Sequence, residues 1–401
     1  MTTINFRYLS EPDMIEAGVL DIARCVDVME ETLILLNQGD YMMAGLNHNS
    51  HGAMISFPKD PGFEGMPADG PDRRFMAMPA YLGGRFNNTG VKWYGSNAEN
   101  KQDGLPRSIH VFVLNDTVTG APKAIMSANI LSAVRTGAVP GVGVKYLSNP
   151  DSTVLAVIGP GVMAKTNTDA IMALRPGIET IKVKGRSQRG VDSFAAYIND
   201  RYPGVEVVTA DSIEEAVKDA DIVMASTTTD AAGPSAFPYF RQEWLKPGCL
   251  VAAPAAARFD DEFLAGDARL VVDAYGLYEA WEEEYGDQAF VLLGIPGTKW
   301  YDLAREGALP KEKIEVVADV AEGKAPGLGS RDSDDLLRRR HARRRCLLGH
   351  RPLRRRRGEE HRPGAEPLGH AGAGVIRVNP KETAAGYRRN GSTIDSSTNT
   401  T

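Results

Sequence analysis

The sequence has few cysteines and no pattern that would pair them. Only three occur among 401 residues, at Cys25, Cys249 and Cys346. Their scatter, their odd number and the lack of a CxxC spacing exclude a disulfide framework and a cysteine-based zinc site. We therefore expect reduced thiols in a cytoplasmic protein. His48 and His51 lie three residues apart, but we find no third ligand and predict no metal site.

The chain also lacks long apolar runs and an excess of positive charge. No hydrophobic stretch reaches the length that spans a bilayer, and the first residues show no basic segment followed by an apolar core, as a signal peptide would. We therefore expect no membrane association. The formal net charge is -6, which argues against general affinity for nucleic acid.

One segment opposes this acidic balance. Residues 338–357 contain eleven arginines, no lysine and no acidic residue. Such a run could be a nucleic-acid-binding arm, a natural basic disordered tail, or a segment foreign to the fold. Because the rest of the chain is strongly acidic, we do not favour the first interpretation. We expect no regular structure in residues 331–401.

The hydrophobic pattern changes along the chain. Apolar residues at helical spacing predict an amphipathic helix over residues 21–37, and short apolar segments bounded by turn residues predict strands over residues 40–125. From about residue 150, apolar strands alternate with helix-like segments, a pattern typical of a parallel sheet covered by helices. We predict an α/β protein, with an α+β substrate-binding and dimerisation domain in residues 1–130 and a Rossmann-type dinucleotide-binding domain in residues 131–330.

The clearest motif is a glycine turn between a strand and a helix. The run "VLAVIGPGVMA" contains Gly159-Pro-Gly161-Val-Met-Ala164. The first glycine permits a tight turn, the second lets the backbone approach a pyrophosphate, and the helix N-terminus favours its negative charge. An ordinary strand-to-helix turn is the alternative. We assign these residues to the cofactor site: Gly159, Gly161, Val162, Met163, Thr227 and Thr228.

The end of the next strand bears on the choice of cofactor. NAD sites usually place an acidic residue there to bind the ribose 2′-hydroxyl. This chain has "KGRSQR" instead, in which Arg186 and Ser187 could hold a 2′-phosphate. We therefore predict NADP(H) in preference to NAD(H).

Three segments carry a family resemblance: "RFMAMPAYLGG…TGVKWYGSN", "LNDTVTGAPKAIMSANILSAVRTGA" and "VLAVIGPGVMA". In this order and spacing the chain resembles the ornithine cyclodeaminase/mu-crystallin family, from the N-terminal helix to about residue 330. The Lys-Trp-x-Gly-Ser piece is most similar to its amino-acid (opine-type) dehydrogenase branch. The resemblance implies a nicotinamide cofactor, a small amino-acid or imino-acid substrate and a homodimer.

The resemblance also implies substrate residues. In the family, the positions that match Lys92 and Arg135 hold the substrate carboxylate near the nicotinamide. Their setting agrees with this role, because each lies in an otherwise apolar or uncharged segment, where a cation is unusual without a partner. Two cations at the surface are the alternative. We add Arg74 and His110 as further substrate contacts, although a lone histidine on a strand is more often structural.

Two departures from the family pattern concern the substrate side. The family's upstream arginine is missing from the stretch around His48 and His51. Relatives carry an alanine-rich helix after Arg135, whereas this chain has Gly137 and Pro140 there, and we expect them to weaken or kink that helix.

The predicted reaction depends on one missing carboxylate. In ornithine cyclodeaminase an aspartate handles the side-chain amine, and the matching position here is Ala252. Alanine cannot orient or deprotonate an ammonium group. We therefore predict an oxidoreductase acting on the C–N bond of an amino acid, an N-substituted amino acid or its imine, with Lys92 as catalytic residue. The alternatives are a cyclodeaminase-type lyase and a mu-crystallin-like binding protein.

The arginine run has a possible origin in the reading frame. Relatives end with Gly-Met-Pro-Val and, later, Asn-Leu-Trp-Asp-Thr-Pro, and neither occurs here. Codons for the segment after Arg340, read one base later, can encode both motifs in this order. We therefore interpret the tail as a frame-shifted C-terminus, with the slip between residues 332 and 337.

Overall fold

The computed structural model describes residues 3–227, 233–266 and 268–328, which belong to one unit of the chain. The predicted tail, residues 331–401, and Thr228 of the predicted cofactor site lie outside the described residues. None of the helices within the described ranges combines the length and the apolar character that a membrane span needs.

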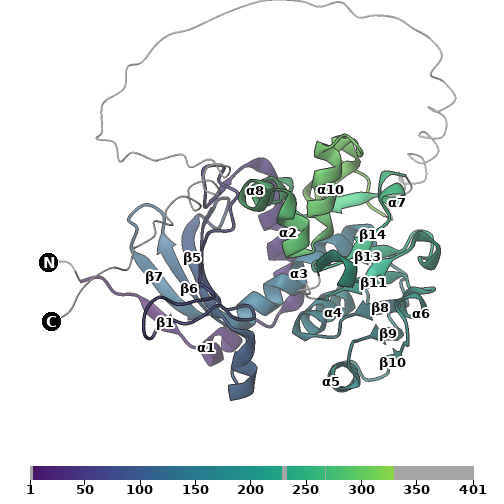
Figure 1. The fold of residues 1–401 in the computed structure, drawn as a ribbon, viewed down its shortest axis with the longest axis horizontal. Coiled ribbons are helices and arrows are strands. Elements are labelled where there is room, and N and C mark those ends of the chain that lie inside the picture. The colour runs from purple at the N-terminus through teal and green to yellow at the C-terminus, as the bar shows by residue number, and fades with distance from the viewer. Residues whose placement is uncertain (1–2, 228–232, 267, 329–401) are drawn as a thin grey trace, which may run out of the picture. The chain divides into compact units, whose positions relative to one another are not determined.

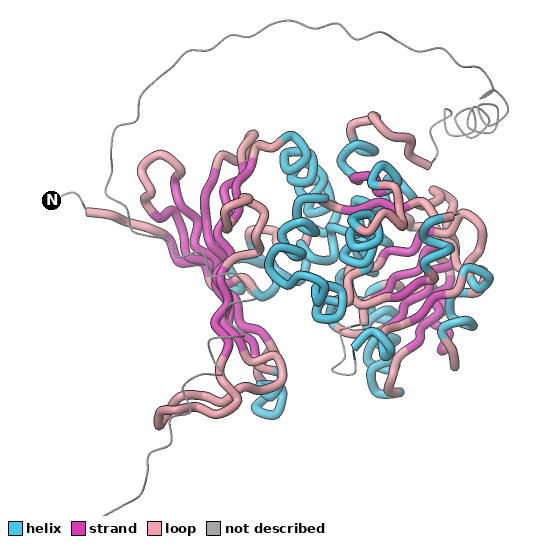
Figure 2. Tube along the Cα trace, turned by 45° about the horizontal axis from the view of Figure 1, so that its top comes forward, coloured by secondary structure: helices cyan, strands magenta, loops and turns pink. Residues whose placement is uncertain are grey.

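The first part of the described chain is built on a seven-stranded sheet (Figures 1 and 2). The strand order is β1-β7-β6-β5-β4-β2, with β3 also paired to β4, and every pair is antiparallel except β1 with β7. The strands are β1 (Arg7–Leu9), β2 (Tyr41–Met43), β3 (Ala53–Ser56), β4 (Arg74–Leu82), β5 (Asn88–Ser96), β6 (Ser108–Asp116) and β7 (Pro122–Ser127). The strands expected over residues 40–125 are thereby confirmed.

The register of this sheet sorts its side chains between two faces. Tyr94 pairs with His110, and Trp93 pairs with Val111. Directly paired residues of antiparallel strands share a face, and neighbours along a strand alternate. Lys92, Tyr94 and His110 therefore lie on one face of the sheet, and Trp93 and Val111 on the other.

The predicted N-terminal amphipathic helix is α2 (Ile22–Gln38), which follows the short helix α1 (Glu11–Glu16). Asp21 caps it, because the Asp21 side chain accepts a hydrogen bond of 3.0 Å from the backbone nitrogen of Arg24. The helix ends at Gly39, which adopts the left-handed φ of 81° that favours glycine. The prediction over residues 21–37 is confirmed.

The second part contains a five-stranded parallel sheet in the order β10-β9-β8-β11-β13. Its strands are β8 (Val154–Ile158), β9 (Thr180–Lys184), β10 (Glu206–Thr209), β11 (Ile222–Ala225) and β13 (Leu250–Ala252). The chain starts in the middle at β8, runs to one edge and then continues on the other side from β11. This is the Rossmann order, and ligands bind such sheets where the order reverses, at the carboxyl ends of β8 and β11.

Helices cover both faces of this sheet. The helices are α4 (Val162–Leu174), α5 (Gln188–Arg201) and α6 (Ile213–Val217). One hydrophobic cluster joins α4 and α5 to one face of the strands, with the buried side chains of Ile171 and Phe194. A second cluster on the other face includes α6, with Val217. The predicted α/β fold with a Rossmann-type domain is confirmed.

Helix α3 (Asn129–Leu147) contains the residues that we expected to weaken or kink it. It continues through Pro140, and the weakening or kink stays a prediction. A Cβ added to Gly137 would lie 2.6 Å from the backbone of Thr166 on α4, and one added to Gly141 would lie 2.9 Å from a side chain of α2. The glycines therefore allow close helix packing, and this packing outweighs their low helix propensity.

The remaining elements follow β11. They include the strand pairs β12 (Tyr239–Phe240) with β14 (Arg258–Phe259) and β15 (Leu270–Val272) with β16 (Ile314–Val316). The helices are α7 (Asp261–Ala265), α8 (Tyr275–Tyr285), α9 (Ala289–Leu293), α10 (Pro296–Arg305) and α11 (Val317–Ala321). The domain boundary expected near residue 130 stays a prediction.

Candidate active site

The glycine turn after β8 has the geometry that a dinucleotide site requires. Gly159 adopts a left-handed φ of 85°. A Cβ added there would lie 3.0 Å from the backbone of Thr227 and 2.6 Å from its Oγ1. The Gly159 backbone nitrogen donates a hydrogen bond of 2.9 Å to the carbonyl of Lys184 at the end of β9. Glycine is therefore required at this position by both conformation and space.

The N-terminus of α4 is open to a ligand. Gly161 is its N-cap residue in an extended conformation, and no side chain of the described residues caps the helix. A Cβ added to Gly161 would meet nothing within 4 Å, and Val162 is 74% exposed. Helix N-termini leave backbone N–H groups without intrahelical partners, and these bind phosphate. The turn therefore fits the pyrophosphate of a dinucleotide.

The residues predicted to contact the ribose lie beside this turn. A Cβ added to Gly185 would lie 3.0 Å from the ring of Pro160, so the end of β9 packs directly against the glycine turn. Arg186 and Ser187 follow and are exposed. The Ser187 hydroxyl accepts a hydrogen bond of 3.3 Å from the backbone nitrogen of Gly190 and thereby caps α5.

Lys92 lies in the middle of β5 and has no counterion among the described residues. No hydrogen bond or ion pair joins its ammonium group to another described residue, and its Nζ lies 5.1 Å from the centre of the Tyr94 ring. Burial and, to a smaller extent, the positive charge of Arg135 together lower the pKa of Lys92 to about 8. A cation in this setting is available for an anionic ligand.

Arg135 approaches Lys92 from helix α3. The first turn of that helix is tied to the sheet, because the Asn129 side chain accepts a hydrogen bond of 2.7 Å from the backbone nitrogen of His110. Burial lowers the pKa of Arg135, and Cys25 and Tyr94 act in the opposite direction. No carboxylate of the described residues perturbs the pKa of Lys92 or that of Arg135. The structure thus brings two predicted substrate residues together as an uncompensated pair.

His110 joins Lys92 and Arg135 in one group of side chains, because both cations act on its pKa. Its ring packs against the edge of Tyr94 at 4.9 Å between ring centres. Burial lowers the pKa of His110 to about 4, helped by the charges of Lys92 and Arg135. At neutral pH the imidazole is therefore uncharged, and its Nδ1 is buried without a hydrogen-bond partner.

His51 is a fourth member that the sequence did not predict. Its ring stacks on that of Trp281 on α8 at 4.8 Å, with 20° between the ring planes. Burial lowers the pKa of His51 to about 4, and Arg135 and Lys92 add to this shift. Its Nδ1 is likewise buried without a partner. The only signal in the sequence was a histidine in a polar loop, which says nothing about its neighbours.

Arg74, the remaining predicted substrate residue, has a compensated charge. It forms an ion pair with Asp72, which also binds Arg107 at 3.0 Å. Burial alone would lower the pKa of Arg74, but Tyr94 and Asp72 raise it overall. Arg74 is thus connected to the group through Tyr94, whereas Lys92 and Arg135 carry the uncompensated charge.

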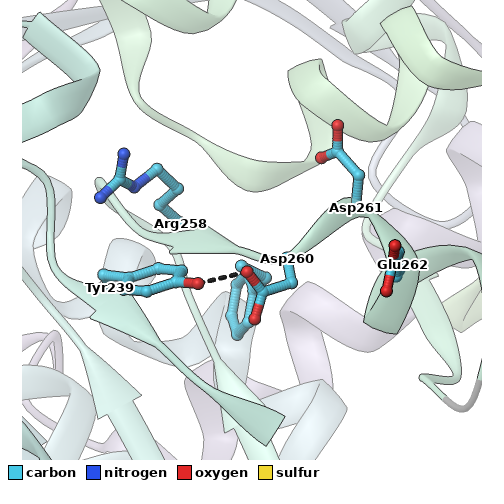
Figure 3. Close-up of a pocket in the computed structure, with 6 residues that line it drawn as sticks. Tyr239, Arg258, Asp260, Asp261 and Glu262 are labelled. Atoms are coloured by element: carbon cyan, nitrogen blue, oxygen red, sulfur yellow. Dashed lines mark hydrogen bonds between the residues drawn. The ribbon is translucent and has the colours of Figure 1, made fainter.

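A separate hollow lies outside this group (Figure 3). Its volume is about 650 Å³, and its lining includes none of the predicted site residues. Three of the residues around it are acidic, and the hydroxyl of Tyr239 donates a hydrogen bond to Asp260. The hollow is lined by Tyr239, Arg258, Phe259, Asp260, Asp261 and Glu262.

Two curated enzymes are similar in sequence to this chain. The N-((2S)-2-amino-2-carboxyethyl)-L-glutamate dehydrogenase of Staphylococcus aureus is 26% identical over 261 residues, which cover 61% of this chain and 76% of that protein. The Delta(1)-pyrroline-2-carboxylate reductase of Bacillus cereus is 29% identical over 266 residues, which cover 65% and 73%. These relatives confirm the predicted class, an NAD(P)-dependent oxidoreductase of amino acids or their imines.

The fold and the family have independent support. An archaeal alanine dehydrogenase, solved as a dimer with bound NAD, superposes with a TM-score of 0.59 at 23% identity, over 81% of this chain and 87% of that one. The model of the ornithine cyclodeaminase/mu-crystallin family matches residues 19–335. The predicted family is therefore confirmed, and this chain belongs to the ornithine cyclodeaminase/mu-crystallin family.

Proposed function

We propose that the protein oxidises a small amino acid or N-substituted amino acid at its C–N bond, or reduces the corresponding imine, with Lys92 and Arg135 holding the substrate carboxylate. The observation that carries this proposal is the uncompensated pair. Both cations are withdrawn from water, and no described carboxylate perturbs the pKa of either one. Two such charges are unfavourable until an anion joins them. A bound nicotinamide would supply or accept the hydride at the substrate carbon.

Lys92 has a second proposed role as the catalytic residue that moves a proton. With a pKa of about 8, its ammonium group is mostly protonated at neutral pH but loses a proton far more readily than an exposed lysine. It can therefore neutralise the carboxylate and also relay a proton to the substrate nitrogen or to a water molecule. Arg74 and His110 stay proposed substrate contacts.

The charges of the site disfavour the lyase alternative. A diamino substrate carries a side-chain ammonium group that needs an acidic partner, and Ala252 occupies the carboxyl end of β13, where the cyclodeaminase mechanism uses an aspartate. No carboxylate of the described residues acts on Lys92, Arg135 or His51. An additional ammonium group would therefore be repelled by the two cations.

We further propose NADP(H) as the preferred cofactor. The support is the position of Arg186 and Ser187 at the exposed end of β9, next to the glycine turn. A clear advantage of NADH over NADPH in the Michaelis constants would contradict this preference. Gly159, Gly161, Val162, Met163 and Thr227 would hold the dinucleotide.

We also propose that the protein is a homodimer in the cytoplasm. The face of the seven-stranded sheet opposite Lys92 exposes large apolar side chains, with Phe75 38%, Trp93 39% and Ile109 47% exposed. An apolar sheet face of this kind is typical of a protein interface. The unpaired thiols of Cys25 and Cys249 suit a reducing compartment.

The test is a substrate panel with both cofactors. We expect oxidation of NADPH with cyclic imines, or with 2-oxo acids plus amines, and loss of this activity in the Lys92→Met variant. Release of ammonia from ornithine without net change of the cofactor would favour the lyase. Cofactor and ligand binding without any turnover would favour a mu-crystallin-like binding protein.

A further inference from the structure

His51 is held in place from two sides. Its loop presses on the sheet, because a Cβ added to Gly52 would lie 1.9 Å from the carbonyl oxygen of Ala77 on β4. Helix α8 presses on the loop from the other side, because a Cβ added to Gly276 would lie 2.7 Å from Oδ1 of Asn49. Such packing leaves the loop little freedom to move.

Polar contacts tie the same loop to α8 and to β2. The Asn47 side chain donates a hydrogen bond to the carboxylate of Glu283, and the hydroxyl of Tyr41 donates one to Asn49. Two acidic residues of α8, Glu279 and Glu283, act on Tyr41 and Asn47 and do not contribute to the pKa of His51. None of the described carboxylates perturbs that pKa.

The orientation of His51 leaves one polar atom unused. The stack on Trp281 fixes the plane of the imidazole, and Nδ1 is buried without a hydrogen-bond partner in the described structure. A buried polar atom without a partner costs free energy, so such atoms at functional sites often await a ligand. The residue after His51 packs on the strand position opposite Lys92, because a Cβ added to Gly52 would lie 3.0 Å from the Cα of Met78, the direct partner of Lys92 in the sheet. A ligand held by Lys92 would therefore come close to His51.

The two cations can bind the carboxylate of an amino acid but not its nitrogen, which needs a hydrogen-bond acceptor. They donate hydrogen bonds and suit the carboxylate, but they cannot accept a bond from the nitrogen on the neighbouring carbon. No described carboxylate perturbs the pKa of these groups, which favours a neutral side chain as the acceptor. A neutral imidazole has one unprotonated nitrogen that accepts hydrogen bonds.

We propose that His51 is a substrate-binding residue, whose Nδ1 accepts a hydrogen bond from the nitrogen of the substrate while Lys92 and Arg135 hold its carboxylate. This inference rests on the proposed function and adds a determinant of specificity to it. The site then selects acids that carry nitrogen on the carbon next to the carboxylate over acids that lack it, because an unpaired Nδ1 penalises the nitrogen-free ligand.

The test compares ligands with and without the nitrogen. L-Alanine, L-proline and L-glutamate serve as substrates, and propanoate, cyclopentanecarboxylate and glutarate serve as their nitrogen-free inhibitors. In His51→Leu we expect KM for the amino acids to rise about tenfold to a hundredfold, as for a lost hydrogen bond to a charged group, while the inhibition constants change less than about twofold. Lys92→Met should weaken both kinds of ligand.

Two more variants separate a specific contact from a structural effect. The amide oxygen of an asparagine lies where Nδ1 of a histidine lies, so His51→Asn should restore most of the affinity for the amino acids. In His51→Gln the amide reaches further and should not restore it. The control is His48→Asn, since His48 is an exposed histidine of the same loop with a φ of 59° that asparagine tolerates. This variant should behave like the wild type.

The outcomes also distinguish this inference from the proposed function. Equal weakening of both kinds of ligand in folded His51→Leu, or of neither kind, would overturn the role of His51 alone. If His51→Leu does not fold, the comparison of His51→Asn with His51→Gln decides, and equal affinities in these two variants would overturn the inference. If the wild-type protein binds none of these amino acids and turns over none of the imines of the substrate panel, the proposed function fails, and the role of His51 fails with it.

Discussion

The side chain of Asn129 accepts a hydrogen bond of 2.7 Å from the backbone nitrogen of His110, and this bond joins the first turn of α3 to strand β6. Through it, Arg135 on the helix is held in a defined position relative to the sheet that carries Lys92. We expect Asn129→Ala to lower the free energy of unfolding by about 1 kcal/mol, because a half-buried N–H group loses its partner. Asn129→Asp keeps an acceptor and should retain the stability. Thermal unfolding of both variants measures this, and equal losses would contradict the assignment.

The buried ammonium group of Lys92 should lower the free energy of unfolding. Its pKa falls from an ordinary 10.5 to about 8 on folding, so the unfolded chain binds more protons between these values. The destabilisation is therefore fully present below pH 8 and is relieved as the pH rises towards 10.5. We expect Lys92→Met to be more stable than the wild type at pH 7, by up to about 3 kcal/mol, and the difference to vanish at high pH. Denaturant unfolding at a series of pH values would reveal this dependence, and a difference that grew with pH would refute the buried cation.

The activity should depend on pH through the same group. Above pH 8 Lys92 loses its proton and with it half of the cationic pair. We expect kcat/KM for the amino-acid substrate to fall as the pH rises through the pKa of the free enzyme. In Lys92→Arg the cation persists at high pH, so this fall should disappear even if the turnover is lower. A fall that persisted in Lys92→Arg would assign the titration to another group.

Alanine substitutions at the two glycines of the turn should have different effects on stability and on cofactor binding. Gly159→Ala places a Cβ at a left-handed φ and against Thr227, so we expect a loss of stability of about 1–2 kcal/mol together with loss of cofactor binding. Gly161→Ala has open space and an extended conformation, so the fold should stay intact while the new methyl group obstructs the pyrophosphate. Scanning calorimetry measures the thermal stability of each variant, and the fluorescence of bound NADPH measures its cofactor affinity. Full cofactor affinity in Gly161→Ala would argue against this binding mode.

The exposed face of the seven-stranded sheet should form the dimer contact. Trp93→Glu places a charge among Phe75 and Ile109, and we expect it to convert the dimer into a monomer. Val118→Glu, on a side chain that is 88% exposed in the turn after β6, is the matched control and should leave the dimer intact. Light scattering coupled to size-exclusion chromatography measures the mass. An unchanged dimer in Trp93→Glu would exclude this face.

Much of the fold was predictable because its signals are local. Each strand, turn and helix of the dinucleotide part is a continuous segment, so apolar runs and glycine positions revealed the order of the elements and the turn at Gly159. Lys92 and Arg135 were proposed because the family resemblance points to their positions, and their apolar or uncharged segments agreed with that role. The reading-frame hypothesis for the arginine run concerns residues outside the described structure and stays a prediction.

Other features depended on contacts between distant segments. Nothing near His51 in the sequence indicates that Trp281 stacks on it, nor that Asp72 neutralises Arg74. The sequence also did not show that Gly137 packs against α4, because propensity describes an isolated helix and the packing surface comes from elsewhere in the chain. Local pattern therefore specified the elements, and the family resemblance pointed to the two candidate cations. Tertiary packing decided which charges stay uncompensated and which imidazole lies beside them, because those contacts join segments that are distant in the sequence.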